Sequence, residues 1–262
     1  MTELMPTLFI SHGPPTLAAI DHPAARFWES LADRIPRPSA IICVSAHWEA
    51  VRPTVTGAAR PGTIHDFGGP PPLFSLSYPA PGDPDLARRV RELLSDAGLT
   101  AGIDSDRGLD HGVWVPLIRI YPDAAIPVLQ LSVQTDADPA HHLAIGRTLA
   151  PLRREGVLIL GSGGATHDLL SVSDHQRDDP PTGYASAFDA WVRETIAAGA
   201  VETLLDYENA APEARRNHPF PAEHFFPLFV PLGAAIDDAP GRRIFEGFMY
   251  GVLSMAVYLW SG

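Results

Sequence analysis

The sequence contains almost no cysteine. Its 262 residues include a single one, Cys43, which lies inside an apolar segment and has no second cysteine to pair with. This excludes a disulfide framework, and a cytoplasmic protein fits best. Long apolar runs are also missing, because no stretch approaches the roughly 18 residues of a membrane span. No basic segment followed by a longer apolar one opens the chain, so we expect no signal peptide.

Basic residues are outnumbered by acidic ones. The sequence has 19 Lys and Arg against 31 Asp and Glu, which gives a formal net charge of −12. Binding to nucleic acid or to an anionic membrane needs basic patches, so this balance argues against both as partners. The hydrophobic content of 45% and the charged content of 19% are those of an ordinary globular protein.

Three apolar segments each lead into a turn of small residues that carries a histidine. The segments and their histidines are residues 8–10 with His12, 41–44 with His47, and 157–160 with His167. Continuous apolar runs are typical of strands buried on both faces of a parallel sheet. Ligands bind beyond the carboxyl ends of such strands, so we expect these three imidazoles to gather at one edge of the sheet.

The rest of the chain alternates helix and strand patterns. We expect helices at 24–34, 84–97, 113–121, 139–154, 184–198 and 222–228, and further strands at 51–56, 100–103, 126–133, 243–250 and 254–260. Pro53 favours an edge position for the strand at 51–56. The Gly/Pro-rich residues 57–72 are typical of a lid or binding loop. The pattern predicts one α/β domain over residues 1–262, with a central, mostly parallel sheet flanked by helices and a strand-rich C-terminal end.

A metal is one reason to gather imidazoles, since imidazole is a common ligand of zinc, iron and copper. The alternative is that His12, His47 and His167 are neutral and bonded to nearby carbonyls. Spacing alone leaves both open, although delivery of three histidines by the same kind of turn favours the metal. Gly163-Gly164 is also compatible with a phosphate-binding turn, but no phosphate-loop or dinucleotide motif accompanies it.

Other histidines have simpler explanations. We expect His22 and His175 in solvated turns, and His218, which precedes a proline, in a structural role. His141 and His142 fall in the first turns of a predicted helix, where we expect them to be exposed.

Several motifs together resemble a known family. They are Ser-His-Gly-Pro-Pro at 11–15, Ser-Ala-His-Trp at 45–48, the segment 64–69, Asp-His-Gly-Val-Trp at 110–114, and the segments 161–167, 221–228 and 251–255. In this order they resemble the DOPA-dioxygenase type of class III extradiol ring-cleaving dioxygenases, the family of the catalytic beta subunit of protocatechuate 4,5-dioxygenase. The resemblance implies a single α/β domain with a mononuclear metal site, commonly Fe(II), with Zn(II) in some bacterial members.

The resemblance also implies roles for individual residues. His12 and His47 match two metal ligands. The third ligand is a histidine matching His224 in DOPA-type members and a glutamate in protocatechuate-type members, and Glu223 stands next to His224. Adjacent residues on a helix point about 100° apart, so we expect only His224 to face the metal. His167 matches an acid–base group in one branch and a metal ligand in the other.

The resemblance also implies a second active-site histidine, and the long loop offers two further candidate residues. His111 matches a histidine close to the substrate, with a catalytic role alongside that of His167. His65 and Asp66 stand in the Gly/Pro-rich loop, where they are expected to close over the substrate.

For the reaction, the resemblance implies extradiol opening of a catechol by O2, with a muconic-semialdehyde product. Two alternatives belong to other classes. Zinc held by three histidines activates water, which would make the protein a hydrolase. The Memo-type proteins share this fold and act chiefly in binding. Phe225, Phe226 and Phe229 are compatible with a core and equally with the interface of a homo-oligomer.

Overall fold

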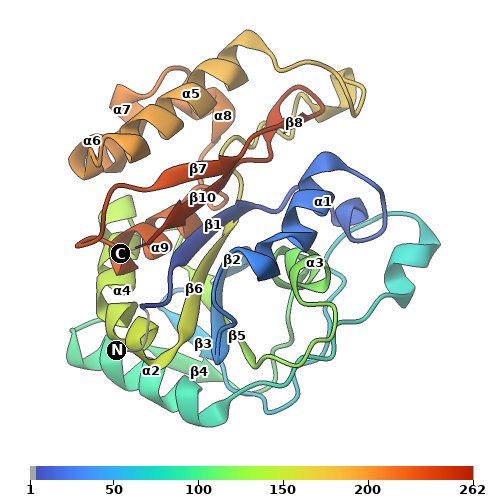
Figure 1. Cartoon of the computed structure of the whole chain (residues 1–262). Helices are drawn as coiled ribbons and strands as arrows, with labels where there is room; N and C mark the ends of the chain where they lie inside the picture. Colours follow the sequence, from blue (N-terminus) through green and yellow to red (C-terminus); the bar gives the residue numbers. More distant parts are fainter. Residues whose placement is uncertain (1–3, 262) are drawn as a thin grey trace.

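The fold is built on an eight-stranded sheet with the order β4-β3-β5-β2-β6-β1-β10-β7 (Figure 1). The computed structural model describes residues 4–261. Four parallel strands form its centre: β5 (Val128–Val133), β2 (Ala40–Glu49), β6 (Val157–Gly163) and β1 (Thr7–Ser11). Antiparallel β10 (Val257–Trp260) and β7 (Arg242–Phe245) continue the sheet beside β1. On the other side lie β3 (Thr54–Thr56) and β4 (Gly102–Asp104).

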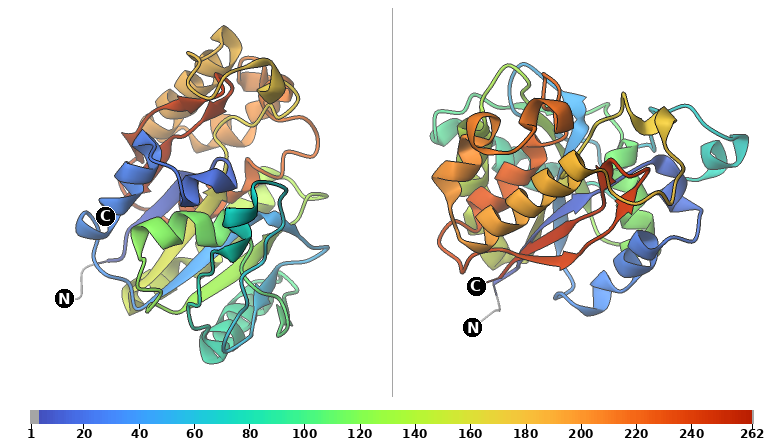
Figure 2. Two further views of the ribbon diagram at one scale, coloured as in Figure 1. Left: turned by 90° about the vertical axis from the view of Figure 1, so that its right-hand side faces the viewer. Right: turned by 90° about the horizontal axis from the view of Figure 1, so that it is seen from above.

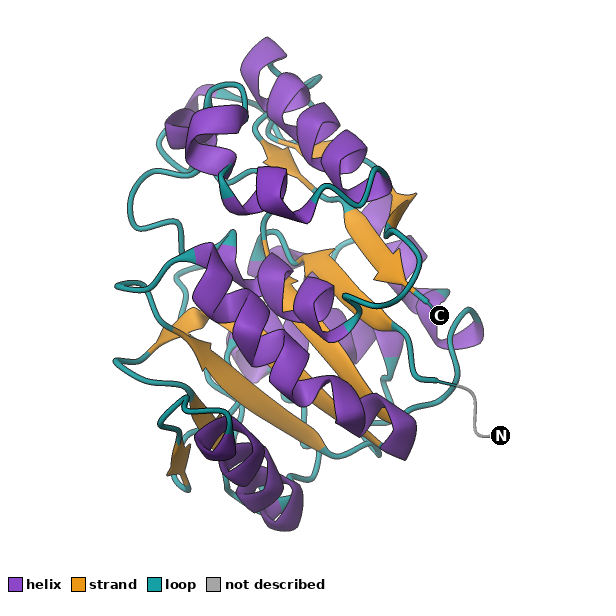
Figure 3. Cartoon of the chain, turned by 90° about the vertical axis from the view of Figure 1, so that its left-hand side faces the viewer, coloured by secondary structure: helices purple, strands orange, loops and turns teal. Residues whose placement is uncertain are grey.

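Helices cover both faces of this sheet (Figure 3). One face carries α1 (Pro23–Glu29) and α3 (His111–Ile120), and the other carries α2 (Pro84–Asp96), α4 (Pro139–Leu149) and α9 (Phe229–Ala234). A further group lies beside β7 (Figure 2): α5 (Gly183–Ala197), α6 (Val201–Leu205), α7 (Tyr207–Ala210) and α8 (Ala214–Asn217). A hairpin of β8 (Phe248–Met249) and β9 (Leu253–Ser254) stands apart from the sheet. Within residues 4–261 no helix is long and apolar enough to cross a membrane.

The central strands are apolar throughout because both faces are buried. In β1, Phe9 joins the core beneath α2, α4 and α9, whereas Leu8 and Ile10 join the core beneath α1 and α3. The same alternation in β2 and β6 explains why their sequences show no polar face. The predicted α/β fold, with a mostly parallel sheet, flanking helices and a strand-rich C-terminal end, is confirmed.

Several predicted elements differ from the structure. The helix predicted at 24–34 ends at Glu29 and is followed by a 3-10 helix, and the strands predicted at 243–250 and 254–260 are each divided, into β7 with β8 and β9 with β10. β2 continues to Glu49, so His47 lies within a strand rather than in a turn after it. β3 is not an edge strand, since β4 pairs with its outer side; Pro53 precedes β3 and contributes only its carbonyl, which accepts from Gly102 N at 2.8 Å. The predicted helix at 222–228 is a turn followed by a 3-10 helix (Phe226–Leu228), so the helical spacing argument for Glu223 and His224 was wrong.

Two histidines predicted to be solvated are buried. His142 lies under the 3-10 helix, where its ring stacks on Phe226 with ring centroids 4.6 Å apart. Its Nδ1–H donates to Asp138 O (3.0 Å), and its Nε2 accepts from Gln134 N (3.2 Å). His22 is the N-cap of α1 and accepts from Ala24 N. His218 is buried with Nε2 3.1 Å from Ala165 O, which confirms its structural role.

The packing of α4 against α9 yields a first prediction. A Cβ atom added at Gly146 would lie 2.0 Å from the Val230 carbonyl oxygen, so the two helix backbones touch there. We expect Gly146→Ala to lower the free energy of unfolding by about 1–3 kcal/mol, because the helices must separate. Gly183→Ala in α5 is the matched control, since its added Cβ meets nothing within 4 Å. Urea unfolding followed by circular dichroism compares the two; equal stability of both variants would contradict the close contact.

Burial of His142 yields a second prediction. Desolvation lowers the pKa of His142 to about 4, whereas in the unfolded chain this imidazole takes up a proton near pH 6.5. The unfolded state therefore binds more protons, and the free energy of unfolding falls as the pH drops from about 6.5 to about 4. In urea titrations of metal-free protein, His142→Gln should flatten this slope by up to ~1.4 kcal/mol per pH unit. An unchanged slope would show that His142 does not contribute to it.

Candidate metal centre

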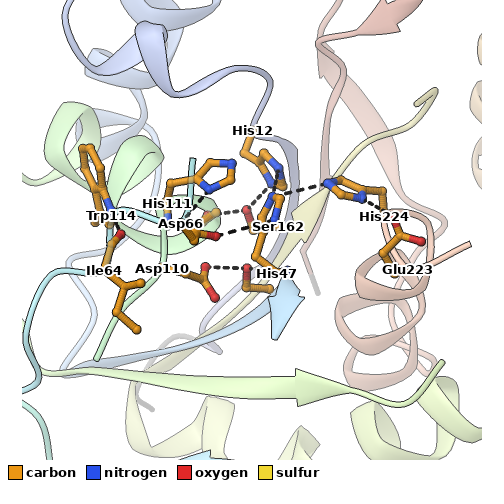
Figure 4. A network of polar contacts seen from close by, with 12 residues as sticks. His12, His47, Ile64, Asp66, Asp110, His111, Trp114, Ser162, Glu223 and His224 are labelled. Carbon is orange, nitrogen blue, oxygen red and sulfur yellow. Dashed lines mark hydrogen bonds and ion pairs between the residues drawn. The ribbon is translucent and has the colours of Figure 1, made fainter. Parts of the chain in front are cut away.

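Three imidazoles from distant parts of the chain meet at the carboxyl edge of the sheet (Figure 4). His12 follows β1, His47 lies near the end of β2, and His224 stands in the turn before the 3-10 helix. The Nε2 atom of His47 is 3.0 Å from that of His12 and 3.3 Å from that of His224. All three nitrogens lie within 4.8 Å of one another. Of the three histidines expected to gather at this edge, His12 and His47 meet in this group, His224 completes it, and His167 lies outside it.

The proton of His12 is placed by its neighbour Ser162 in β6. Pro116 has no N–H, so the carbonyl of Gly112, four residues earlier in α3, lacks its usual helical donor. The Ser162 hydroxyl donates to this carbonyl. Its oxygen then accepts from His12 Nδ1, which is 3.0 Å away. With the proton on Nδ1, His12 keeps a lone pair on Nε2.

The proton of His224 is placed in a comparable way by Glu223. The Glu223 carboxylate oxygen lies 2.8 Å from His224 Nδ1 and accepts a hydrogen bond from its N–H. Close packing on β6 fixes the turn that carries both residues: the carbonyl of His224 accepts from Gly164 N at 2.9 Å, and a Cβ at Gly163 would lie 2.1 Å from that carbonyl. Glu223 therefore orients His224 from behind, as carboxylates do for metal-bound histidines.

With these proton positions, unprotonated nitrogens of neighbouring rings face one another, and a cation between them would accept their lone pairs. Burial, followed by the neighbouring imidazoles, lowers the pKa of His47 to about 3 and the pKa values of His12 and His224 well below the ordinary value. All three rings are thus neutral at pH 7. A proton on His47 Nε2 satisfies only one of its two contacts, whereas a metal ion accepts all three lone pairs. This donor set fits a metal that prefers imidazole.

A second cluster lies beside the first, where Asp66 meets His47 and His111. The backbone N–H of His111 donates to Asp66 Oδ1 (3.0 Å), and His111 Nδ1 lies 3.0 Å from the same oxygen, outside hydrogen-bond geometry. Asp66 Oδ2 is 3.7 Å from His47 Nδ1. Burial acts to raise the pKa of Asp66, but the hydrogen bonds and charges of His111 and His47 outweigh it and lower that pKa to about 2. Asp66 is therefore an ionised partner for both imidazoles.

The Gly/Pro-rich loop is fixed where it reaches this cluster. Ile64 N donates to Leu109 O (2.8 Å), and Trp114 Nε1 donates to Ile64 O (2.9 Å). His65 does not face the other histidines, because its Nε2 lies 3.0 Å from Leu76 O. The loop thus presents Asp66 to the histidines.

A buried carboxylate supports the start of α3. Asp110 precedes His111 and is fully buried; its Oδ1 accepts from Ser45 Oγ (2.7 Å), and its Oδ2 lies 3.0 Å from Arg107 Nη2. Gln130 of β5 donates to the same carboxylate. These bonds tie the first turn of α3 to β2 and β5, and so fix His111 relative to His47.

His167 lies against the far side of His224. The two rings are stacked, with ring centroids 3.3 Å apart and an angle of 13° between the rings. A ring nitrogen of His167 groups with a carboxylate oxygen of Glu223 and a ring nitrogen of His224, and not with the nitrogens of His12 and His47. Burial, followed by His218 and the other histidines, lowers the pKa of His167 to about 3, so this ring is also neutral.

All five predicted site histidines line one cavity of about 300 Å³. Its other walls come from the turn after β1, the Gly/Pro-rich loop, residues 169–172 and the β8–β9 hairpin. The sequence did not predict roles for Ser162 and Asp110 or the orienting role of Glu223. All three stand inside the motifs that carry the histidines, which is the signal that marks them.

Comparisons with known proteins agree on one family. Residues 6–256 match the model of the catalytic LigB subunit of aromatic ring-opening dioxygenase. A Beta vulgaris protein named 4,5-DOPA dioxygenase extradiol is 44% identical, over 97% of this chain and 96% of its own length. An Escherichia coli K12 protein of the same name is 41% identical, over 96% and 93%. The crystal structure of an uncharacterized E. coli K12 protein superposes with a TM-score of 0.82 at 37% identity, covering 97% of this chain and 99% of that one.

The protein is a class III extradiol dioxygenase, an enzyme that opens an aromatic ring with O2 at a non-haem metal. Within that class, the chain belongs to the family of the catalytic LigB subunits of aromatic ring-opening dioxygenases. The resemblance that the motifs indicated is confirmed.

Metal content separates the two roles predicted for His167. We expect His12→Ala, His47→Ala and His224→Ala each to abolish stoichiometric metal binding, because each removes one of three converging lone pairs. His167→Ala should keep one metal per chain, since its nitrogen lies outside that group. Elemental analysis after loading and desalting measures the ratio, with His141→Ala as a control distant from the site. Loss of metal from His167→Ala would make His167 a ligand.

Proposed function

We propose that this chain, as one catalytic domain over residues 1–262, opens a catechol next to its two hydroxyls at a single Fe(II). The proposed ligands are His12, His47 and His224. The observation that carries the proposal is the convergence of their three Nε2 atoms, two of which are left unprotonated by the bonds to Ser162 and Glu223. Three neutral nitrogens leave the remaining coordination positions open for substrate.

Iron is proposed over zinc because of the reaction. When bound, Fe(II) supplies the electron transfer that O2 needs to react with a catechol, whereas Zn(II) has no redox chemistry. Zn(II) fits the same donors, so zinc content of the purified protein is compatible with the proposal. A cytoplasmic location, which rests on the single buried Cys43, belongs to the same proposal.

Proton transfer is assigned to the two remaining histidines. His167 is neutral and lines the cavity, so we assign it the removal of a phenolic proton from the catechol. His111 lies beside the ionised Asp66, with its Nδ1 3.0 Å from Asp66 Oδ1. We therefore assign His111 the return of a proton as the ring opens. The curated relatives named above carry DOPA in their names, which makes DOPA the first catechol to test.

Oxygen uptake tests the proposal. Protein purified without oxygen and loaded with Fe(II) should consume one O2 per catechol and form a yellow product. Zn(II)-loaded protein should consume none, and His111→Ala should keep its metal but turn over at least about 100-fold more slowly, the usual contribution of a general acid–base group. Full metal content without O2 uptake for any catechol would contradict the proposal. Hydrolytic activity in the Zn(II) form would then favour the hydrolase.

A further inference from the structure

Much of the cavity wall outside the histidines is apolar. Its apolar side chains are those of Pro14, Pro15, Phe67, Leu169, Val172 and Leu253. Among residues 4–261, no arginine, aspartate or glutamate lines this cavity, and besides the histidines its one ionisable side chain is that of Tyr250. The chain contains no lysine, so any cation contributed by a side chain would have to be an arginine.

Charged side chains beside the lining residues are engaged in other contacts. Asp66 accepts from the backbone N–H of His111 (3.0 Å) and lies 3.7 Å from His47 Nδ1. Asp168 is buried and accepts from the Tyr184 hydroxyl (2.6 Å) and from Ser171 Oγ (2.8 Å). Arg177 forms two bonds of 3.0 Å to Asp178 at the surface. Arg243 donates to Asp189 at 2.6 Å. Glu223 stands behind His224, against a neighbouring pocket.

The hydroxyls of the cavity wall are also largely committed. Thr166 Oγ1 donates to Val252 O (2.7 Å), and Ser254 Oγ donates to Asp189 Oδ1 (2.6 Å). Ser11 Oγ accepts from Ala165 N (3.0 Å). The remaining polar side chain among the lining residues is the phenol of Tyr250. Tyr250 takes a left-handed φ of 53° at the tip of the β8–β9 hairpin, and Arg177 O holds its backbone N–H at 2.8 Å.

We propose that this cavity selects catechols whose ring substituent is uncharged and apolar, such as a short alkyl chain, over DOPA and carboxylated catechols. The proposal rests on the proposed function and adds the substrate class. The side chain of DOPA carries a carboxylate and an ammonium group, and neither finds a charged partner on these walls. Removing such a group from water without a partner is costly, whereas an alkyl group gains from the same apolar contacts.

Steady-state kinetics of the Fe(II)-loaded enzyme test this selectivity. We expect kcat/KM for 4-ethylcatechol to exceed that for DOPA, for dopamine and for 3,4-dihydroxyphenylacetate by at least about tenfold, because a cavity without partners rejects an added charge. A ratio below tenfold for any of the three would overturn the proposal. Calorimetric titration of the same protein without oxygen gives the ratio of Kd values independently of turnover. If no catechol is turned over, the proposed function fails, and the Kd ratio alone decides the selectivity.

Introducing a positive charge into the cavity wall tests whether selectivity shifts toward a carboxylated catechol. Leu169 lines the cavity and is 57% exposed, so the fold tolerates a longer side chain there. We expect Leu169→Arg to raise kcat/KM for 3,4-dihydroxyphenylacetate relative to 4-ethylcatechol by at least about tenfold, since it supplies the missing cation. Leu169→Gln, neutral and also longer than leucine, should leave this ratio within about twofold. An unchanged ratio in Leu169→Arg, or an equal rise in Leu169→Gln, would overturn the role of charge.

Discussion

Three imidazole nitrogens that share one small space cannot all keep their lone pairs there unless a cation accepts them. His12, His47 and His224 create this situation, and the rest of the site maintains it. The bonds that hold the Nδ1 protons of His12 and His224 lie behind the rings, on Ser162 and Glu223. Burial adds to the effect, because it disfavours the protonated imidazolium that would otherwise relieve the crowding. The protein is thus built to present neutral nitrogen donors to a metal.

The backbone determines where those donors stand. Pro116 breaks one helical hydrogen bond in α3, and the carbonyl left over, that of Gly112, is the group that fixes the Ser162 hydroxyl and through it the ring of His12. Gly163 has no side chain, so the turn bearing His224 packs directly on β6. An imino acid and a glycine, neither of which touches a metal, are therefore as necessary to this geometry as the histidines themselves.

Much of this was accessible from the sequence. The apolar runs of β1, β2 and β6 predicted a parallel sheet buried on both faces, and the turns after them predicted where His12 and His167 lie. Predictions from local sequence pattern were wrong where tertiary contacts determine burial or backbone path. His142 has the sequence context of an exposed helical residue but is covered by Phe226. Glu223 and His224 lie in a segment with the composition of a helix but form a turn. The path of this turn is set by its close contact with Gly163 and by Pro227 in the following 3-10 helix. The hydrophobic periodicity of the sequence does not predict that the Ser162 hydroxyl donates to the Gly112 carbonyl.

Crystals grown without oxygen in the presence of Fe(II) would test the central claim directly, through an anomalous difference map collected at the iron edge. The account predicts a single strong peak bounded by the Nε2 atoms of His12, His47 and His224. A peak between His47, Asp66 and His111, or between His167, Glu223 and His224, would contradict it, since each of those groups also brings its donor atoms within 4.8 Å. A map without any peak among these residues would remove the metal centre altogether.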